Sequence, residues 1–180
     1  MDKRVVRTRS AIRQTLLSLI GERPVERVTT TELCREAHIN RNTFYAHYHS
    51  PEDVLREIED ELVTDLEAEM GRRHKDDEVA LALIRHMARN QELYRTLWRC
   101  RSSRMKDRAM DLVATQGLEI WRQEGLAELD EGELFLRFSA QGSLAVVDRW
   151  LYNGCHATPE EIAKLISRFV VEGMRSFNHA

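Results

Sequence analysis

The chain has 180 residues, of which 42% are apolar, and its formal net charge is −3. This apolar content suffices for a buried core, and the low numbers of Pro (3) and Gly (8) favour helices over a turn-rich β fold. No apolar run approaches the roughly 20 residues that span a bilayer, no signal-peptide pattern is present, and three widely spaced cysteines favour reduced thiols in a cytoplasmic protein.

The first predicted helix is basic and amphipathic. Its apolar positions keep helical spacing, and it is predicted to end near Gly21, because Pro24 resists continuation. Residues 1–50 hold nine Lys and Arg against five Asp and Glu, whereas the remainder holds eighteen against twenty-five. A basic N-terminal module on an acidic body suits a protein that presents one face to phosphates.

The segment from Thr29 to Tyr48 predicts two short helices around a tight turn. Thr29 and Glu32 fit a capping box at the start of the first helix, and Asn40 can cap the second, predicted over 41–48. On the second helix Phe44 and Tyr48 share one face, which leaves polar side chains elsewhere: Arg41, Asn42, Thr43, Tyr45 and His47. Such a helix suits the DNA major groove. Spacing alone leaves an ordinary surface hairpin open as an alternative.

The stretch 28–55, VTTTELCREAHINRNTFYAHYHSPEDVL, resembles the DNA-binding domain of the tetracycline-repressor (TetR) family of bacterial transcription regulators. Residues 37–40 stand for the Ala-Gly-Val-Ser of the family pattern, Phe44 and Tyr45 for its aromatic pair, and Tyr48 for its core Phe. The resemblance implies a three-helix DNA-binding domain and, in the rest of the chain, a helical regulatory domain.

Two departures from the family pattern lie in this stretch. His38 occupies the place of the turn Gly, so a slightly different turn is expected, although His tolerates positive φ better than most residues. Pro51 replaces a Lys that contacts phosphate in many members, and the backbone amides of the following helix are expected to take over that contact.

The resemblance and the side-chain chemistry together assign roles in DNA binding. Arg41 and Asn42 are expected to reach base edges, with phosphate or backbone contacts as the alternative. The other candidates are expected to bind phosphates: Thr30, Thr43, Tyr45 and His47. The N-terminal arginines either enter a flanking minor groove or stay disordered.

The rest of the chain predicts further helices over about 53–70, 77–90, 91–100, 103–124, 131–152 and 158–177, so that the fold is all-α with about nine helices. The polar stretch 71–77 is the candidate boundary. We therefore expect a DNA-binding domain over 1–50, a connecting helix and linker over 51–75, and an effector-binding and dimerisation domain over 76–180.

The last two predicted helices are apolar over wide arcs, which is typical of helices packed against two partners. A dimer interface accounts for both more easily than burial in one short chain does, and the resemblance implies a four-helix bundle between two copies. The expected interface residues are Phe138, Gly142, Val146, Trp150, Ile166, Phe169, Val170 and Gly173.

A pocket for a small-molecule effector is implied by the resemblance alone. Candidate lining residues are His86, Met87, Tyr94, Trp98, Met110, Gln116 and Trp121, although such a set is more often ordinary core. No catalytic, cofactor or metal motif is present. The expected protein is a homodimeric regulator of a pseudo-palindromic operator, most often a repressor, and not an enzyme. A ligand-independent architectural or protein-recruiting DNA-binding factor, and a helical adaptor that binds protein, remain open.

Overall fold

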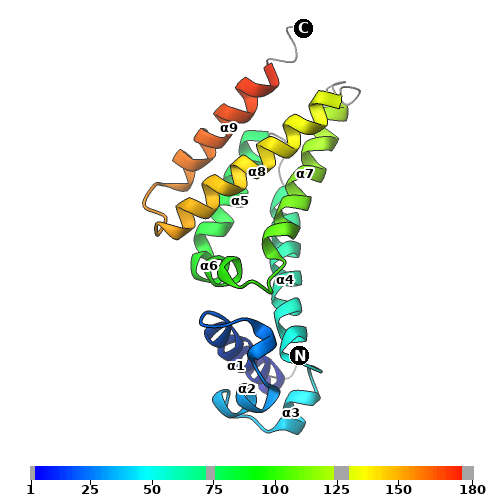
Figure 1. The fold of residues 1–180 in the computed structure, drawn as a ribbon, viewed down its shortest axis with the longest axis vertical. Helices are drawn as coiled ribbons and strands as arrows, with labels where there is room; N and C mark the ends of the chain where they lie inside the picture. The colour runs from blue at the N-terminus through cyan, green and yellow to red at the C-terminus, as the bar shows by residue number, and fades with distance from the viewer. Residues whose placement is uncertain (1–2, 72–75, 124–129, 176–180) are drawn as a thin grey trace. The chain divides into compact units, whose positions relative to one another are not determined.

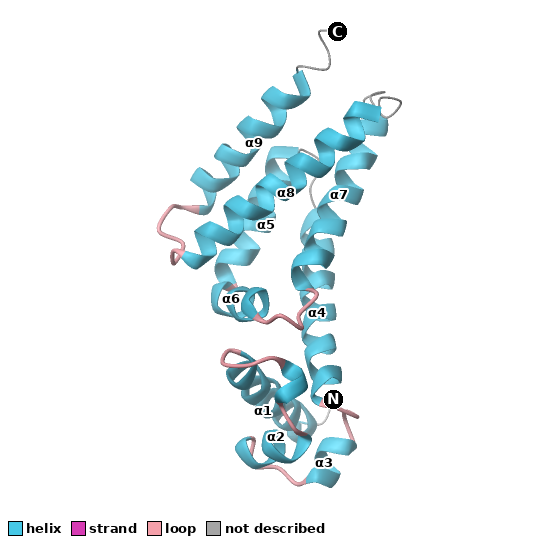
Figure 2. Ribbon diagram, viewed as in Figure 1, coloured by secondary structure: helices cyan, strands magenta, loops and turns pink. Residues whose placement is uncertain are grey.

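The computed structural model describes residues 3–71, 76–123 and 130–175, and every regular element in these ranges is a helix (Figures 1 and 2). The all-α expectation is thereby confirmed. The elements in chain order are α1 (Lys3–Ile20), the short 3-10 helix η1 (Val25–Arg27), α2 (Thr30–Glu36), α3 (Arg41–Tyr45), α4 (Pro51–Gly71), α5 (Asp76–Arg89), α6 (Gln91–Arg99), α7 (Met105–Gln123), α8 (Asp130–Tyr152) and α9 (Pro159–Arg175). No helix in the described ranges is both long and apolar enough to cross a membrane.

The chain forms two compact units. The first comprises Met1–Thr64 and Glu92–Met105, and the second comprises Asp65–Gln91 and Lys106–Ala180. This differs from the expected division, which assigned everything after residue 75 to one regulatory domain. Residues 72–75 of the expected linker lie outside the described ranges.

Two carboxylates explain why the segment after α6 belongs to the first unit. Glu59 of α4, which is 4% exposed, accepts hydrogen bonds from Ser103 Oγ (2.6 Å) and from the Arg104 amide (2.9 Å). Glu26 of η1 accepts a hydrogen bond of 2.5 Å from Ser102 Oγ. A buried carboxylate requires hydrogen-bond donors, and this turn supplies them to Glu59. The turn therefore packs with η1 and α4, although its serines lie more than forty residues after Glu26 and Glu59 in the chain.

The core of the first unit follows from the helical spacing of apolar residues. α1 packs on α2 and α2 on α3. The amphipathic α1 buries Ile12, Leu16 and Ile20, three of its apolar positions at helical spacing, and the same core contains Leu33 of α2 and Phe44 of α3. This packing holds the two helices of the helix-turn-helix with one face inward and one face in solvent.

In the second unit α9 packs on both α5 and α8. The turn between α8 and α9 is closed by local bonds: Gly154 has a φ of 81°, and the Trp150 indole donates to the Ala157 carbonyl at 2.9 Å. Thr158 and Glu161 form a capping box at the start of α9, with the Thr158 amide 2.8 Å from the Glu161 carboxylate.

Candidate nucleic-acid interface

The start of α2 is capped as its sequence predicts. The Thr29 hydroxyl accepts a hydrogen bond from the Glu32 amide at 3.2 Å. The Glu32 carboxylate forms an ion pair with Arg23. This ion pair, followed by smaller effects that include the Thr29 amide, lowers the pKa of Glu32. The cap fixes the position of Thr30, the first residue of α2, whose side chain is half-buried.

The turn after α2 keeps the backbone that a glycine would give it, although the residue is His38. Its φ is 53°, in the left-handed region. The His38 amide donates to the Arg35 carbonyl (3.2 Å), and the Ile39 amide donates to the Cys34 carbonyl (3.0 Å). These two bonds form a complete Schellman motif. The expected change in turn geometry is therefore absent, and His38 bears the conformational cost instead.

The second helix of the motif, α3, is shorter than predicted. Asn40 caps it, with its Oδ1 2.8 Å from the Asn42 amide, but the regular helix ends at Tyr45 and not at residue 48. The amides of His47 and Tyr48 both donate to the Phe44 carbonyl, which closes the last turn tightly. Phe44 and Tyr48 are nonetheless both buried, with ring centroids 5.8 Å apart, so the predicted aromatic face is present.

Three of the predicted DNA-binding residues converge on the exposed side of the motif. Tyr45 is 47% exposed. The side chains of Arg41, one turn earlier, and of Thr30 in α2 lie close to the Tyr45 phenol, and both lower the pKa of Tyr45. The nearby Tyr45 phenol in turn raises the pKa of Arg41. A cation and two hydroxyl groups from both helices of the motif thus form one cluster with donors for phosphate or base oxygens.

The remaining predicted residues lie in α3 or directly after it. Asn42 and Thr43 are exposed at the start of α3. His47 is half-buried, and its ring centroid lies 6.5 Å from that of Tyr48. Asn42 and Thr43 thus offer hydrogen-bonding groups from the first turn of the helix, where readers of the major groove contact base edges.

The first turn of α4 has fewer free backbone amides for binding a phosphate than expected. Pro51 has no amide hydrogen, the Asp53 amide donates to Ser50 Oγ (3.3 Å), and the Asp53 carboxylate accepts from the His49 amide (3.0 Å). Glu52 and Asp53 also place negative charge in this first turn. The protein's own side chains therefore cap this helix end.

A polar network behind α3 was not predicted from the sequence. Tyr48 hydrogen-bonds to Glu57 of α4 and to Arg9 of α1. Arg9 pairs with Glu57, and Arg13 pairs with Glu61. These two arginines lie in α1, which begins at Lys3, so neither belongs to a disordered arm. The sequence feature that could have indicated this network is Tyr48, which carries a hydroxyl group at a position where the family pattern has Phe.

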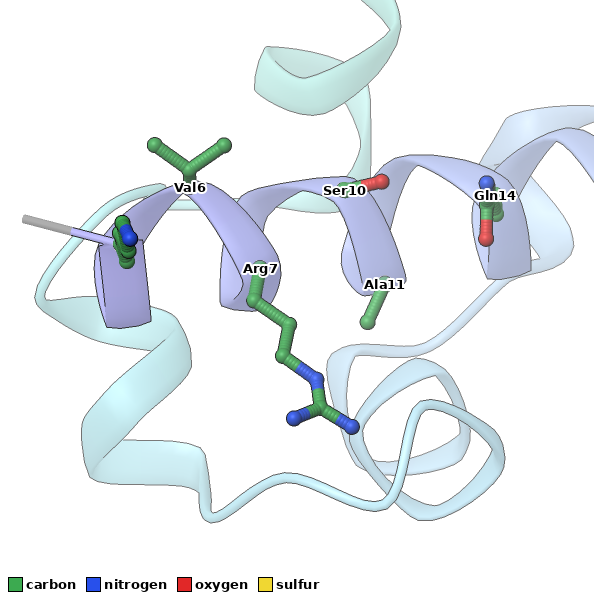
Figure 3. Close-up of a pocket in the computed structure, with 6 residues that line it drawn as sticks. Val6, Arg7, Ser10, Ala11 and Gln14 are labelled. Atoms are coloured by element: carbon green, nitrogen blue, oxygen red, sulfur yellow. The ribbon is translucent and has the colours of Figure 1, made fainter.

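The outer side of α1 carries a shallow hollow of about 480 Å³. Figure 3 shows Arg7 and Ala11 on one side of this helix and Val6 on the other. The residues that line the hollow all come from this single helix: Lys3, Val6, Arg7, Ser10, Ala11 and Gln14. It is therefore a surface groove and not an enclosed ligand cavity.

Two sequence profiles match the chain. The profile of the bacterial regulatory proteins of the tetR family matches residues 12–58, which contain the whole helix-turn-helix. The profile described as a transcriptional regulator C-terminal region, of the TetR type, matches residues 77–172. The chain belongs to the TetR family. Members of this family are transcriptional regulators that bind DNA, and the family is not one of enzymes.

Other proteins share parts of this organisation. An uncharacterised helix-turn-helix transcriptional regulator of Bacillus subtilis (strain 168), YxbF, is 37% identical over 57 residues, or 31% of this chain and 15% of that protein's length. The fold resembles that of a TetR transcriptional regulator from Streptococcus agalactiae 2603V (TM-score 0.73, 23% identity, 94% and 96% of the two chains). It also resembles FadR from Thermus thermophilus, a TetR family repressor in complex with lauroyl-CoA (TM-score 0.54, 23% identity, 92% and 94%).

The candidate effector-binding residues are divided between the two units of this TetR family member. His86 and Met87 are buried on α5, whereas Tyr94 and Trp98 are buried on α6 in the first unit. Met110 is half-buried on α7, and the side chains of Gln116 and Trp121 lie outside the described part of the structure. Burial lowers the pKa of His86, which favours the neutral imidazole.

The candidate dimer residues fall into two groups. Phe138 and Phe169 are 76% and 66% exposed, and Gly142 is exposed too. Trp150 and Ile166 are buried in the second unit. The others are half-buried: Val146, Val170 and Gly173. A Cβ on Gly173 would lie 2.3 Å from the Phe135 ring, so this glycine serves packing within one chain.

Proposed function

We propose that this TetR family protein is a repressor that binds a pseudo-palindromic operator as a homodimer and is released by a small-molecule effector. The observation that carries the proposal is the cluster of Arg41, Tyr45 and Thr30 on the exposed side of the helix-turn-helix. Its donors suit phosphate and base oxygens, and the basic charge of residues 1–50 favours approach to DNA.

Exposed apolar side chains on α8 and α9 support the homodimer. Leu134, Phe138 and Tyr152 of α8 and Leu165 and Phe169 of α9 are each at least 40% exposed. Large exposed apolar groups that gather on one face mark interaction surfaces, because contact with water is unfavourable for them.

The register of α8 and α9 brings Phe138 and Phe169 to similar levels along the two helices, which supports a shared interface. Gly173 lies against Phe135, and Val146 and Ile162 line one hollow of about 600 Å³, so α8 and α9 run antiparallel. By this register Phe169 lies near the level of Phe138. Gly142, one turn further along α8, has no neighbour within 4 Å of a Cβ built on it, which leaves room for a helix of a second copy.

The proposed effector rests on the similarity of this fold to that of another regulator. T. thermophilus FadR, a repressor with a similar fold, was solved with lauroyl-CoA. By analogy, we infer a small molecule that binds the DNA-free and DNA-bound conformations of this protein with different affinity, because only such a difference shifts the equilibrium between them.

Selection of bound sequences from a random duplex library, at near-physiological salt, tests the proposal. We expect enrichment of an inverted repeat whose half-sites are about one helical turn apart or a multiple of it, since each copy inserts one α3 into the major groove. A well-folded protein that enriches no sequence would contradict the proposal and favour an architectural or protein-binding role.

A further inference from the structure

The hydroxyl of Tyr48 joins three helical segments. It donates to Glu57 Oε1 of α4 at 2.7 Å and accepts from Arg9 Nε of α1 at 3.3 Å. Arg9 and Glu57 also pair with each other. Tyr48 itself follows α3 by three residues and is 4% exposed. Each of the three side chains therefore contacts the other two. Through Tyr48, this network holds the segment just after α3 against α1 and α4.

Neighbouring charges stabilise this arrangement. Arg13 lies 3.7 Å from Glu57 and donates to Glu61 at 2.8 Å. The Arg9 guanidinium carbon lies 5.9 Å from the centre of the Tyr48 ring. Burial, and then the bond to Glu57, raise the pKa of Tyr48, so its hydroxyl keeps the proton that it donates.

The reading helix α3 has few other anchors. It is five residues long, and Phe44 is its one buried side chain. The Asn40 cap holds its first turn, while the Phe44 and Tyr48 rings pack at a tilt of 42°. Apolar packing is non-directional, so it restrains the separation of two rings better than their rotation. Hydrogen bonds weaken steeply away from their preferred angles and therefore restrain orientation.

We propose that Tyr48 is a positioning residue for DNA reading, whose hydroxyl fixes the orientation of α3 against α1 and α4. The inference rests on the proposed function and goes beyond it, because Tyr48 is buried and would act from inside the protein. A Phe, the residue of the family pattern, would keep the ring packing and would lack both hydrogen bonds.

Loss of orientation affects the two kinds of DNA contact unequally. Hydrogen bonds to base edges need short distances and correct angles, whereas attraction to phosphates changes slowly with distance. A loosened α3 therefore loses discrimination between sequences before it loses its general affinity for DNA. The ratio of operator affinity to random-duplex affinity is the quantity that reports this effect.

The test compares Tyr48→Phe with Tyr45→Phe in the full-length protein. Each variant removes one tyrosine hydroxyl, and the two positions are three residues apart. For Tyr48→Phe we expect a roughly 5-fold fall in the affinity ratio between the selected operator and a random duplex, within the range of one lost base contact. Faster amide hydrogen exchange over residues 41–48 should accompany it, with a cooperative urea transition that shows a folded protein.

Tyr45→Phe is expected to weaken both duplexes to a similar extent and to leave the ratio and the exchange rates near those of wild type. An unchanged ratio in Tyr48→Phe, or unchanged exchange over residues 41–48, would overturn the positioning role. If wild type itself preferred no sequence, the proposed function would fail instead. The exchange measurement would still decide whether the Tyr48 hydroxyl holds α3.

Discussion

At the scale of single residues, His38 occupies a position that favours glycine. Its φ of 53° lies in the left-handed region, where a Cβ crowds the backbone at a cost of roughly 1–2 kcal/mol. The Schellman bonds of the turn hold it there. His38 thus costs the helix-turn-helix some conformational free energy. The helix caps and the helical spacing of apolar residues in the same motif favour the observed fold.

Replacement of His38 by Gly should raise the free energy of unfolding by about 0.5–1 kcal/mol, because relief of the left-handed penalty exceeds the added entropy of the unfolded chain. Urea unfolding measures the change. As a control, Ala46→Gly, at an exposed residue with an ordinary φ of −70°, should lower stability. A lower stability of His38→Gly would show that the imidazole contributes more than its backbone conformation costs.

Arg41 lies in the exposed cluster with Tyr45 and Thr30 and is the strongest candidate for base reading. We expect Arg41→Ala to weaken operator binding by about 1–3 kcal/mol and to relax discrimination at one base position. Binding of a panel of single-base operator variants measures both effects. Equal losses on operator and random DNA would assign Arg41 to phosphate contact instead.

At the scale of elements, α5 places an ionisable group in the core of the second unit. His86 is 5% exposed, and Asn90 Nδ2 donates to its backbone carbonyl at 3.1 Å. Burial is the largest effect on the His86 pKa and lowers it. The charges of Asp65 and Glu69 act in the opposite direction, and Arg89 lowers the pKa further. The net result favours a neutral imidazole in the packed helix.

The lowered pKa of His86 predicts a loss of stability in acid. Near the ordinary histidine pKa of about 6.5 the unfolded chain binds more protons at this residue than the folded chain, so the free energy of unfolding falls as the pH drops through that value. Urea unfolding at about pH 7.5 and 5.5 should show a smaller fall for His86→Gln than for wild type. Equal falls would mean that other groups account for the acid sensitivity.

At the scale of the whole molecule, the exposed apolar side chains of α8 and α9 support the proposed homodimer, in which two chains bind DNA together. Phe138→Glu combined with Phe169→Glu should convert a dimer of 42 kDa, twice the 21.0 kDa chain, into a monomer, because a charge in an apolar interface loses its hydration. Analytical ultracentrifugation measures the mass. Operator affinity should fall roughly 100-fold or more as the two linked contacts become one.

Thr115→Glu, which adds one glutamate at an exposed position of α7, should leave the dimer intact. A double variant that remains dimeric at micromolar concentration would place the interface elsewhere. A wild-type protein that sediments as a monomer would remove the homodimer from the proposed function.

The elements predicted well from the sequence are those set by neighbours in the chain. Thr29 and Asn40 cap the helices that follow them, because a cap satisfies backbone amides only a few residues away. The end of α3 was predicted less well, since the spacing of Phe44 and Tyr48 fits a regular helix and a tighter last turn equally.

The sequence by itself therefore determined the helices, their caps and the helix-turn-helix, because these depend on short-range bonds and on the helical period. Only the tertiary structure decided which apolar positions are left exposed, as the contrast between buried Trp150 and exposed Phe138 shows. It also decided that residues 92–105 join the first unit and that Tyr48 meets Arg9 and Glu57. These contacts join residues far apart in the chain, and local patterns do not encode which distant groups a helix face will meet.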